Sequence, residues 1–321
     1  MRILVTGGAG FIGSHLCERL VKGGHTVVSI DNFSTGRVSN LTNLSSSSNF
    51  TLVEGSILDS SVLNPLIEQA DYVFHLAAAV GVFNIVKNPL ASLLTNIRGT
   101  ENVLESAYST NTPVFLTSSS EVYGKNISDS LRESDDRILG SPVTLRWSYS
   151  EAKAIDESLA YAYFVEKQLE TRIVRFFNTV GPRQLGAYGM VVPRFVKAAL
   201  ANKPITIYGD GNQTRCFAHV FDVVDAVLAI AFVDNTIGKV INIGNNFEIS
   251  INDLAKRIIL ETGSTSEIMF VPYAEAYGDG FEDMERRVPN IGLIKDLVGW
   301  QPKRDLSTMI ADIATEMQKN T

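Results

Sequence analysis

The stretch Thr6-Gly7-Gly8-Ala9-Gly10-Phe11-Ile12-Gly13 lies between a short apolar run and a helix-compatible segment from Ser14 to Lys22. In a strand, loop and helix unit its glycines have separate functions. Gly7 permits the tight turn, Gly10 lets the backbone approach a pyrophosphate, and Gly13 allows the helix to pack closely on the strand. The helix N-terminus would offer free N–H groups to the phosphates. The stretch therefore predicts a dinucleotide-binding site in a βαβ unit.

A carboxylate ends the next apolar run. Asp31 lies 18 residues beyond Gly13, where it can accept a hydrogen bond from an adenosine ribose 2′-OH. Because a carboxylate repels a 2′-phosphate, Asp31 favours NAD over NADP, although the nearby Arg37 leaves NADP open. Further along, His75-Leu76-Ala77-Ala78 would bring small residues to the carboxyl edge of the sheet, either for a passing cofactor or for helix packing.

The first half of the chain alternates β-branched runs with helical stretches, which is typical of βαβ units on a parallel sheet. Each run is continuously apolar, as expected of strands that helices cover on both faces. We therefore predict an α/β fold with a Rossmann-type, doubly wound parallel sheet. The predicted strands are Ile3 to Thr6, Thr26 to Ile30, Thr51 to Glu54, Tyr72 to Leu76, Val114 to Ser118 and Arg172 to Phe176.

After Pro182 glycine and proline become more frequent and the segments between them shorter. This change predicts a smaller, partly interleaved C-terminal substrate domain. We place the dinucleotide-binding domain at residues 1–180, with 212–246 returning to it, and the second domain at residues 181–321.

Composition limits the partners. The 321 residues include 35 acidic and 28 basic ones, for a net charge of −7, which argues against nucleic acid or an anionic membrane as the main partner. No apolar window approaches a membrane span or a signal peptide. Cys17 and Cys216 stand far apart and give neither a disulfide framework nor a thiolate metal site. We expect a cytoplasmic protein without a metal.

Tyr149 and Lys153 are four residues apart in a predicted helix, so their side chains project from one face. An ammonium beside a phenol lowers the phenol pKa from about 10 toward the range of a general base. Such pairs also arise by chance on helix surfaces. This pair gains weight from the run Thr117-Ser118-Ser119-Ser120-Glu121, whose hydroxyls could bind a substrate alcohol during oxidation. Glu121 would be a second acid or base, or a solvated loop charge.

Six segments occur in order along the whole chain: TGGAGFIGSHL, DNFSTG, HLAAAV, TSSSEVYG, YSEAK and RFFNTVGPR. Together they resemble the extended short-chain dehydrogenase/reductase family that modifies nucleotide sugars. The resemblance implies a tightly held NAD and a C-terminal domain that binds the nucleoside diphosphate. It also implies that Tyr149 is the base, that Lys153 holds Tyr149 and the nicotinamide ribose, and that Ser119 binds the sugar at the reacting carbon.

The resemblance extends to the remaining contacts of both ligands. Relatives commonly carry Asp where this chain has Ser56, so the adenine contact differs here. Asn178, Val192, Arg194, Tyr208, Gln213 and Arg215 would bind the nucleotide of the substrate. The cofactor contacts would be Gly7, Gly10, Phe11, Ile12, Gly13, Asp31, Asn32, Ser34, Thr35, Gly36, Ser56, Ile57, Leu76, Ala77, Ala78, Thr117, Tyr149, Lys153 and Phe176.

Three reactions in this family begin with removal of a hydride from sugar C4. A 4-epimerase only turns the keto sugar over, a 4,6-dehydratase needs an acid and a base at C5 and C6, and a decarboxylase acts on a uronic acid. Simple epimerases usually carry a small residue in place of Glu121. Dehydratases of the deoxythymidine type carry Asp-Glu where this chain has Ser120-Glu121, so their usual acid for water loss is missing here, although the GDP-mannose type manages with a hydroxyl residue and Glu. Ser120 and Glu121 are counted with the catalytic residues.

Two arginine-containing segments, Arg286-Arg287-Val288-Pro289 and Arg146-Trp147-Ser148-Tyr149, resemble those of UDP-glucuronate decarboxylases, which carry an arginine in the sugar pocket. A guanidinium suits bidentate recognition of a carboxylate, although Arg286 and Arg287 could also be a solvated charge pair. The resemblance predicts decarboxylation of UDP-glucuronate to UDP-xylose or its 4-keto intermediate. A UDP-sugar 4-epimerase, and then a nucleotide-sugar 4,6-dehydratase, are the alternatives.

The family resemblance further implies a homodimer, formed through two helices near Pro89 to Ser109 and Ser150 to Gln168. Outside the enzymes, the chain could be a catalytically idle dinucleotide-binding regulator. That reading gives no reason for Tyr149, Lys153 and the hydroxyl run to occur together.

Overall fold

A large parallel sheet forms the centre of the computed structural model, which describes residues 1–81, 85, 87–186, 190–277 and 284–319. All of its neighbouring strands pair in parallel. In spatial order the strands are β11 (Val240–Ile243), β6 (Thr171–Phe176), β5 (Val114–Ser119), β4 (Tyr72–His75), β1 (Arg2–Thr6), β2 (Thr26–Asp31) and β3 (Phe50–Glu54). The predicted fold class is confirmed, and the six predicted strands agree with the observed ones to within one residue at each end.

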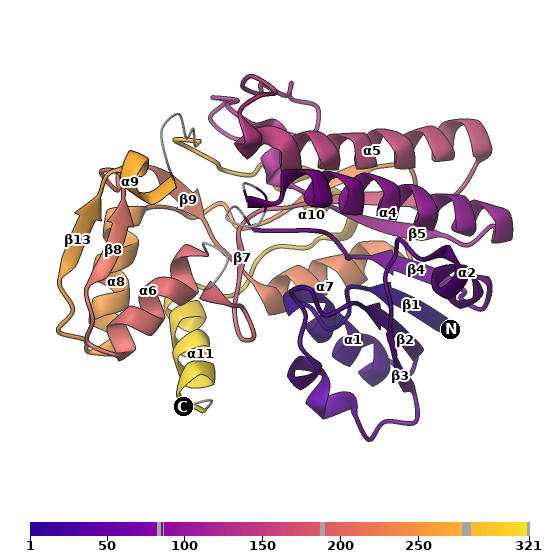
Figure 1. Cartoon of the computed structure of the whole chain (residues 1–321), viewed down its shortest axis with the longest axis horizontal. Helices are drawn as coiled ribbons and strands as arrows, with labels where there is room; N and C mark the ends of the chain where they lie inside the picture. Colours follow the sequence, from indigo (N-terminus) through magenta and orange to yellow (C-terminus); the bar gives the residue numbers. More distant parts are fainter. Residues whose placement is uncertain (82–84, 86, 187–189, 278–283, 320–321) are drawn as a thin grey trace.

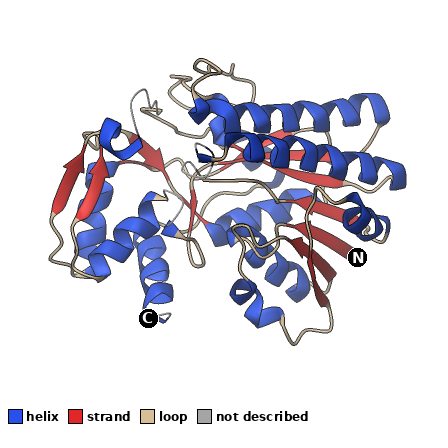
Figure 2. Cartoon of the chain, in the orientation of Figure 1, coloured by secondary structure: helices blue, strands red, loops and turns tan. Residues whose placement is uncertain are grey.

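Side chains of successive strand residues are buried on opposite faces of the sheet, which explains why the strands read as continuous apolar runs. Ile3 and Val5 join one hydrophobic cluster, while Leu4 between them joins another. Figures 1 and 2 show helices on both faces of the sheet. One face carries α1 (Phe11–Lys22), α7 (Val220–Ala231) and α10 (Gly292–Val298), and the other carries α2 (Ser60–Glu68), α4 (Pro89–Thr110) and α5 (Ser148–Lys167).

The strand order reverses at β1, which has β2 on one side and β4 on the other. In an open parallel sheet, ligands bind at the carboxyl edge beside such a reversal, because the following loops diverge there. The loops after β1, β4 and β5 all begin at this edge. The topology therefore positions a binding crevice where the sequence predicts the cofactor.

A third hydrophobic cluster lies beside the sheet, in the lobe that contains α6, α8 and α11 in Figure 1. The helices of this lobe are α6 (Val191–Leu200), α8 (Ile251–Thr262), α9 (Tyr273–Tyr277) and α11 (Leu306–Lys319). Short strands pair as β7 (Thr179–Val180) with β10 (Ala218–His219), β8 (Ile205–Tyr208) with β13 (Ile268–Val271), and β9 (Thr214–Cys216) with β12 (Glu248–Ser250). The domain boundaries predicted from the sequence stay a prediction.

Short 3-10 helices complete the fold: η1 (Val38–Leu44), η2 (Ser120–Tyr123), η3 (Leu145–Trp147) and η5 (Asp234–Thr236). Of these, η2 follows β5 directly and η3 leads into α5, so both lie at the carboxyl edge of the sheet. Among the described residues, the structure contains no helix with the length and apolar character needed to cross a membrane.

Candidate active site

A pocket of about 480 Å³ opens at the carboxyl edge of the sheet and extends toward the second lobe. Most residues predicted to bind the cofactor or the substrate line it, although they come from distant parts of the sequence. They are Gly7, Gly10, Phe11, Ile12, Gly13, Asp31, Asn32, Ser34, Thr35, Ile57, Leu76, Ala77, Ala78, Thr117, Ser119, Ser120, Glu121, Tyr149, Lys153, Phe176, Asn178, Val192, Arg194, Tyr208, Gln213, Arg215 and Arg287.

The glycine loop has the close packing that a dinucleotide site requires. Gly7 has a φ of +72°, a conformation that side chains disfavour. A Cβ on Gly13 would lie 2.2 Å from the carbonyl oxygen of Gly7, so no larger residue fits there without moving the loop. The first turn of α1 thus lies directly against the loop and lines the pocket, where a helix N-terminus suits a phosphate.

Asp31 ends β2 beside this loop. Its carboxylate accepts hydrogen bonds from the backbone N–H groups of Ala9, at 2.9 Å, and Phe33, at 2.8 Å. Burial raises the pKa of Asp31, and the backbone hydrogen bonds partly offset that rise. A Cβ on Gly36 would lie 2.8 Å from both carboxylate oxygens. Gly36 therefore packs against Asp31 and does not itself line the pocket.

Ser56 also lies away from the pocket lining. Its hydroxyl accepts a hydrogen bond from the N–H of Leu58 at 3.2 Å and so shapes the local turn. The neighbours Gly55 and Ile57 line the pocket instead. The adenine end of the predicted cofactor site is therefore built from backbone and an aliphatic side chain at this position.

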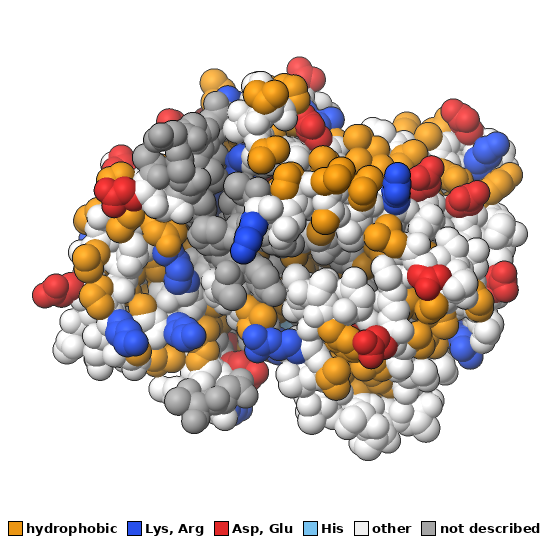
Figure 3. Space-filling model, in the orientation of Figure 1, with side chains coloured by type: hydrophobic (Ala, Val, Ile, Leu, Met, Phe, Trp, Pro, Cys, Tyr) orange, Lys and Arg blue, Asp and Glu red, His pale blue; other side chains and the backbone are white. Residues whose placement is uncertain are grey.

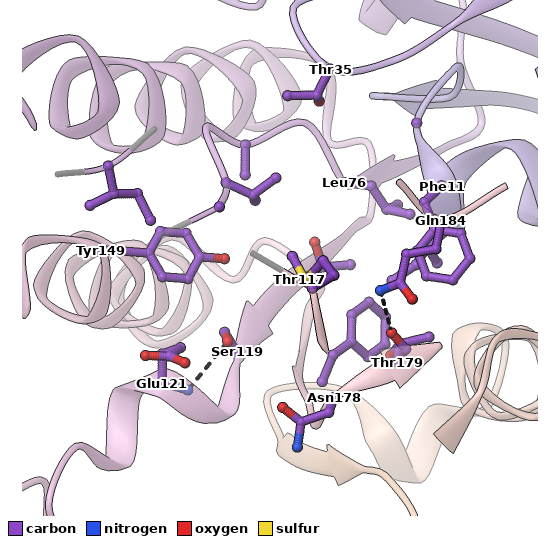
Figure 4. A pocket seen from close by; sticks show the side chains of 18 of the residues that line it. Phe11, Thr35, Leu76, Thr117, Ser119, Glu121, Tyr149, Asn178, Thr179 and Gln184 are labelled. Carbon is purple, nitrogen blue, oxygen red and sulfur yellow. Dashed lines mark hydrogen bonds between the residues drawn. The ribbon is translucent and has the colours of Figure 1, made fainter. Parts of the chain in front are cut away.

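Tyr149 and Lys153 lie on the pocket face of α5, as their spacing predicts. Figure 4 shows the Tyr149 hydroxyl pointing into the pocket, with Thr117, Ser119 and Glu121 nearby and Phe11 and Leu76 on the far side. The Lys153 ammonium donates to the carbonyl of Thr117 and to Asp156, each at 3.1 Å. Two fixed acceptors thus hold the ammonium beside the phenol.

The pKa of Tyr149 differs from the sequence-based expectation. Burial raises this pKa, and the Lys153 ammonium and a hydrogen bond with Ser119 offset only part of the rise. Burial also lowers the pKa of Lys153, but Asp156 and Tyr149 more than compensate, and its pKa is raised overall. The expected net lowering of the Tyr149 pKa is therefore wrong for the protein alone. Lys153 remains a cation, so the pKa of Tyr149 is lower than burial alone would make it.

Glu121 lies between two arginines at the end of the pocket. One carboxylate oxygen accepts from Arg146 at 2.6 Å and the other accepts from Arg287 at 2.5 Å. The guanidinium side chains are 5% and 8% exposed. This largely buried cluster of two cations and one anion carries a net positive charge.

This environment decides the protonation of Glu121. Burial raises its pKa, but Arg146 and Arg287 lower it by more, so that the net pKa lies well below the usual range of a glutamate. Both oxygens are also occupied by charge-assisted hydrogen bonds. An ionised carboxylate has no proton to give, and both of its oxygens already accept from arginines, so these contacts favour a positioning role. The role of Glu121 as a second acid or base stays a prediction.

The two neighbouring arginines predicted for the sugar pocket separate in the structure. Arg287 lines the pocket, where its guanidinium also donates to the Asn178 amide oxygen at 2.9 Å. Arg286 lies outside the lining and donates to both oxygens of Glu248, each at 2.8 Å. Only Arg287 can therefore meet a ligand in the pocket directly.

The far end of the pocket is formed by the second lobe. The Arg194 guanidinium lies 4.2 Å above the ring of Tyr208, and the Gln213 amide donates to the Tyr273 hydroxyl at 2.9 Å. Arg215 is buried among these residues. A flat, partly cationic wall of this kind suits a nucleotide base and its diphosphate.

Several residues that line the pocket were absent from the predicted set, and three of them carry polar groups that bear on the site. Arg146 has a sequence signal in the segment before Tyr149, but its meeting with Glu121 depends on the fold. Gln184 follows the Gly181-Pro182 turn and donates to the Thr179 carbonyl at 2.9 Å, as Figure 4 shows. Tyr273 comes from α9 in the second lobe. For the last two no local pattern pointed to the pocket.

The fold and the pocket together define a Rossmann-type dinucleotide enzyme with a tyrosine and lysine pair. The chain belongs to the NAD dependent epimerase/dehydratase family, whose model matches residues 3–244. The predicted family and the predicted cofactor, NAD, are confirmed. NAD fits the residues present, since the glycine loop and the Asp31 carboxylate meet its two main requirements.

Individual relatives are similar over nearly the whole chain. UDP-N-acetyl-alpha-D-glucosaminuronate decarboxylase of Bacillus cytotoxicus is 42% identical over 94% of this chain and 92% of its own. UDP-glucuronic acid decarboxylase 1 of Xenopus tropicalis is 37% identical over 94% of this chain and 68% of its own. The solved UDP-glucuronic acid 4-epimerase of Bacillus cereus, in complex with UDP-glucuronic acid and NAD, covers 100% of both chains with 30% identity and a TM-score of 0.90.

Proposed function

We propose that the protein is an NAD-dependent decarboxylase of a UDP-hexuronate, which oxidises the sugar at C4 and releases carbon dioxide from C6. The observation that carries this proposal is Arg287, a buried guanidinium in the pocket on which Tyr149 also opens. The decarboxylases among the relatives support the substrate class. UDP-glucuronate is the substrate expected from the sequence, and the 42% identical relative adds its 2-acetamido counterpart.

Arg287 has donors left for a substrate carboxylate. Its two terminal nitrogens donate to Glu121 and Asn178, while its buried Nε has no hydrogen-bond partner among the described residues. A buried donor without a partner costs free energy, which a ligand acceptor would recover. The net positive charge of Arg146, Glu121 and Arg287 adds an attraction for an anionic sugar. A hydroxyl of a neutral hexose could accept from the Nε, but a neutral hexose would leave the net positive charge uncompensated.

Tyr149 is proposed as the group that takes the proton from the sugar C4 hydroxyl. NAD, held by the glycine loop and Asp31, would supply the hydride acceptor for C4. Lys153 keeps a positive charge beside the phenol, and Ser119 contributes a hydroxyl to hold the alcohol oxygen. The resulting 4-keto uronate is a β-keto acid. Its C5–C6 bond breaks, the electron pair flows toward the C4 oxygen, and the Tyr149 phenol can return its proton to that oxygen.

In this scheme Glu121 does not transfer a proton but positions the two arginines. It holds the two guanidiniums apart and fixes their orientation, since each oxygen pairs with one arginine. It also limits how strongly Arg287 can bind the substrate carboxylate. This limit matters because tight binding of the carboxylate in the ground state would oppose its loss as neutral carbon dioxide.

A UDP-hexuronate 4-epimerase is the second candidate. The observation in its favour is the full-length structural similarity to the epimerase solved with UDP-glucuronic acid. An epimerase would use the same first step and the same arginine. It differs in keeping C6 and in letting the keto sugar turn over before reduction.

Proton NMR of the products separates these reactions. Purified enzyme and NAD are incubated with UDP-glucuronate, with UDP-N-acetylglucosaminuronate and, as the neutral control, with UDP-glucose. A pentose or 4-keto pentose signal from either uronate supports decarboxylation. A galacto-configured product that retains all six carbons means epimerisation. No turnover of any sugar, with normal NAD binding, would favour the idle regulator.

We further propose that the active species is a homodimer formed through α4 and α5. These helices pack on each other, yet their outer faces retain exposed apolar side chains, seen over both helices in Figure 3. The residues are Leu90, Tyr108, Ile155, Tyr161 and Val165, which are 43–68% exposed. A second copy of the same surface would cover them symmetrically.

A cytoplasmic location accompanies this proposal. Cys17 and Cys216 are both free and buried. Burial raises the pKa of both thiols, so neither is set up for redox chemistry. Unpaired cysteines of this kind suit a reducing compartment.

A further inference from the structure

A buried pair, Tyr123 and Asn242, lies behind the pocket and contacts the segments that carry Glu121 and Arg287. Both side chains are fully buried. The Tyr123 hydroxyl donates to the Asn242 amide oxygen at 2.8 Å. The Asn242 amide nitrogen donates to the carbonyls of Leu131, at 2.9 Å, and Asn290, at 3.3 Å. Because carbonyls only accept, these two contacts fix the orientation of the amide.

The segment after Arg287 is held from both sides. The Leu131 N–H donates to the Val288 carbonyl and the Asn290 N–H donates to the Leu131 carbonyl, each at 2.8 Å. Asn242 then ties Leu131 and Asn290 together from within the sheet. Arg287 thus projects into the pocket from a stretch of backbone whose position depends on Asn242.

The contacts close into a ring. Glu121 and Tyr123 belong to the same 3-10 helix, η2, so the position of one side chain constrains the other. From Tyr123 the ring passes to Asn242, then through Asn290 to Arg287. Arg287 donates back to Glu121 at 2.5 Å. Two elements far apart in the sequence are therefore joined twice, once by the ion pair in the pocket and once by the buried pair behind it.

This closed set of contacts is also anchored to α5, the helix that carries the proposed base. The Arg175 guanidinium lies 4.7 Å above the ring of Tyr123 and donates to both oxygens of Glu157, the shortest contact being 2.7 Å. Glu157 lies on α5, the helix that also carries Tyr149. A displacement of Tyr123 would thus be resisted from the side of Tyr149 as well.

We propose that Asn242 and Tyr123 are positioning residues that hold Arg287 in register with Glu121 and Tyr149, so that the pocket selects a uronate. This inference rests on the proposed function for its choice of ligand. The alternative is a buried polar cluster that stabilises the fold without affecting selectivity. The geometry favours positioning, because the Asn242 side chain contacts Tyr123 and Asn290 in the segments of Glu121 and Arg287, and its third partner, Leu131, is itself bonded to the Arg287 segment.

The test measures carboxylate recognition separately from stability. In a Tyr149→Phe background, which slows turnover, the NAD-loaded protein is titrated with UDP-glucuronate and with UDP-glucose. The ratio of the two dissociation constants isolates the carboxylate contribution. We expect Asn242→Ala to reduce the preference for the uronate by roughly tenfold, and Tyr123→Phe to reduce it less. Binding of UDP alone should stay unchanged.

Tyr72→Phe is the matched control. Tyr72 is a buried tyrosine whose hydroxyl donates to the Ala231 carbonyl at 2.8 Å, at the end of β4 away from the pocket. Its loss should lower stability without changing the ratio. In an Arg287→Ala background, Asn242→Ala should have no further effect on the ratio, since the two residues act in series. An unchanged ratio in both Asn242→Ala and Tyr123→Phe overturns the inference.

A crystal structure of Asn242→Ala makes the test independent of the substrate. We expect the Arg287 side chain to leave Glu121 or to take more than one position. An unaltered ion pair would overturn the positioning role even if the protein proves to act on uronates. Conversely, a wild-type protein without preference for UDP-glucuronate, combined with a displaced Arg287 in the variant, would reject the proposed function and keep the positioning role.

Discussion

Arg287 donates to Glu121 across 2.5 Å, although 166 positions separate them in the chain. Arg146 completes the cluster from the other side at 2.6 Å. The pairing converts a glutamate that could have carried a proton into a fixed negative charge. It also brings a surplus of positive charge to the pocket wall, near the hydroxyl of Tyr149.

The two adjacent arginines provide a matched test of guanidinium geometry at constant charge. We expect Arg287→Lys to lower kcat/KM for a UDP-hexuronate by roughly 10- to 100-fold, because a lysine cannot reproduce the forked contact with Glu121 and Asn178. Arg286→Lys, one residue away but paired with Glu248 outside the pocket, should change kcat/KM by less than about threefold. Initial rates of UDP-hexuronate turnover give kcat/KM for both variants. Equal losses would remove the case for a carboxylate site at Arg287.

Tyr149→Phe should reduce kcat by about 10²- to 10⁴-fold, the usual contribution of a general acid or base. NAD binding should persist, since the variant keeps the ring and loses only the hydroxyl. The measurement pairs a turnover assay with a titration of NAD. Turnover close to that of the wild type would show that another group takes the proton.

The strands could be predicted from the sequence because helices cover both faces of the sheet. In β1, β4 and β5 both faces are covered, so the apolar run and the strand coincide. The edge strand β11 was not predicted as a strand. Its Asn242 interrupts the apolar run, and only the contacts with Tyr123 and Asn290 explain a polar residue in the sheet.

The pocket lining was predictable where motifs are contiguous in the sequence, as in the glycine loop and in Tyr149 with Lys153. Sequence position could not separate Arg286 from Arg287, because the choice of which guanidinium enters the pocket depends on the partners at Glu248 and Glu121. The direction in which the Tyr149 pKa shifts could likewise not be predicted from the sequence. It depends on how completely the fold buries the phenol, which the spacing to Lys153 does not report.

Asp31→Asn should weaken NAD binding by about tenfold or more while leaving UDP binding unchanged, because a neutral amide is a weaker acceptor for a ribose hydroxyl than a carboxylate. Its single amide oxygen can still accept from the Ala9 N–H, but the Phe33 N–H then loses its acceptor, so the titration with UDP also checks that the pocket is intact. Calorimetric titration with NAD and with UDP provides both constants. If both affinities fell together, the ribose contact would be misplaced and Asp31 would serve only the loop.

Tyr161→Glu should dissociate the proposed dimer. Tyr161 is 51% exposed on the outer face of α5, and two copies of a carboxylate in a symmetric interface would repel each other without counter-ions. Light scattering with size-exclusion chromatography measures the mass. A mass of one chain for the wild type already contradicts the dimer. Lys203→Glu, a charge change on an exposed residue of the second lobe, serves as the control and should leave the mass unchanged.

Two buried histidines predict a loss of stability in mild acid. Burial lowers the pKa of His15 to about 4 and that of His75 to about 3, whereas both titrate near 6.5 when unfolded. Below about pH 6.5 the unfolded chain therefore binds more protons than the folded one, and stability falls as the pH falls. Between about pH 7 and about pH 5 each histidine should cost about 2 kcal/mol of unfolding free energy. Urea unfolding at the two pH values measures this change. His75→Gln should be less stable at neutral pH yet lose less on acidification, and an unaltered pH slope in that variant would show that His75 is not responsible.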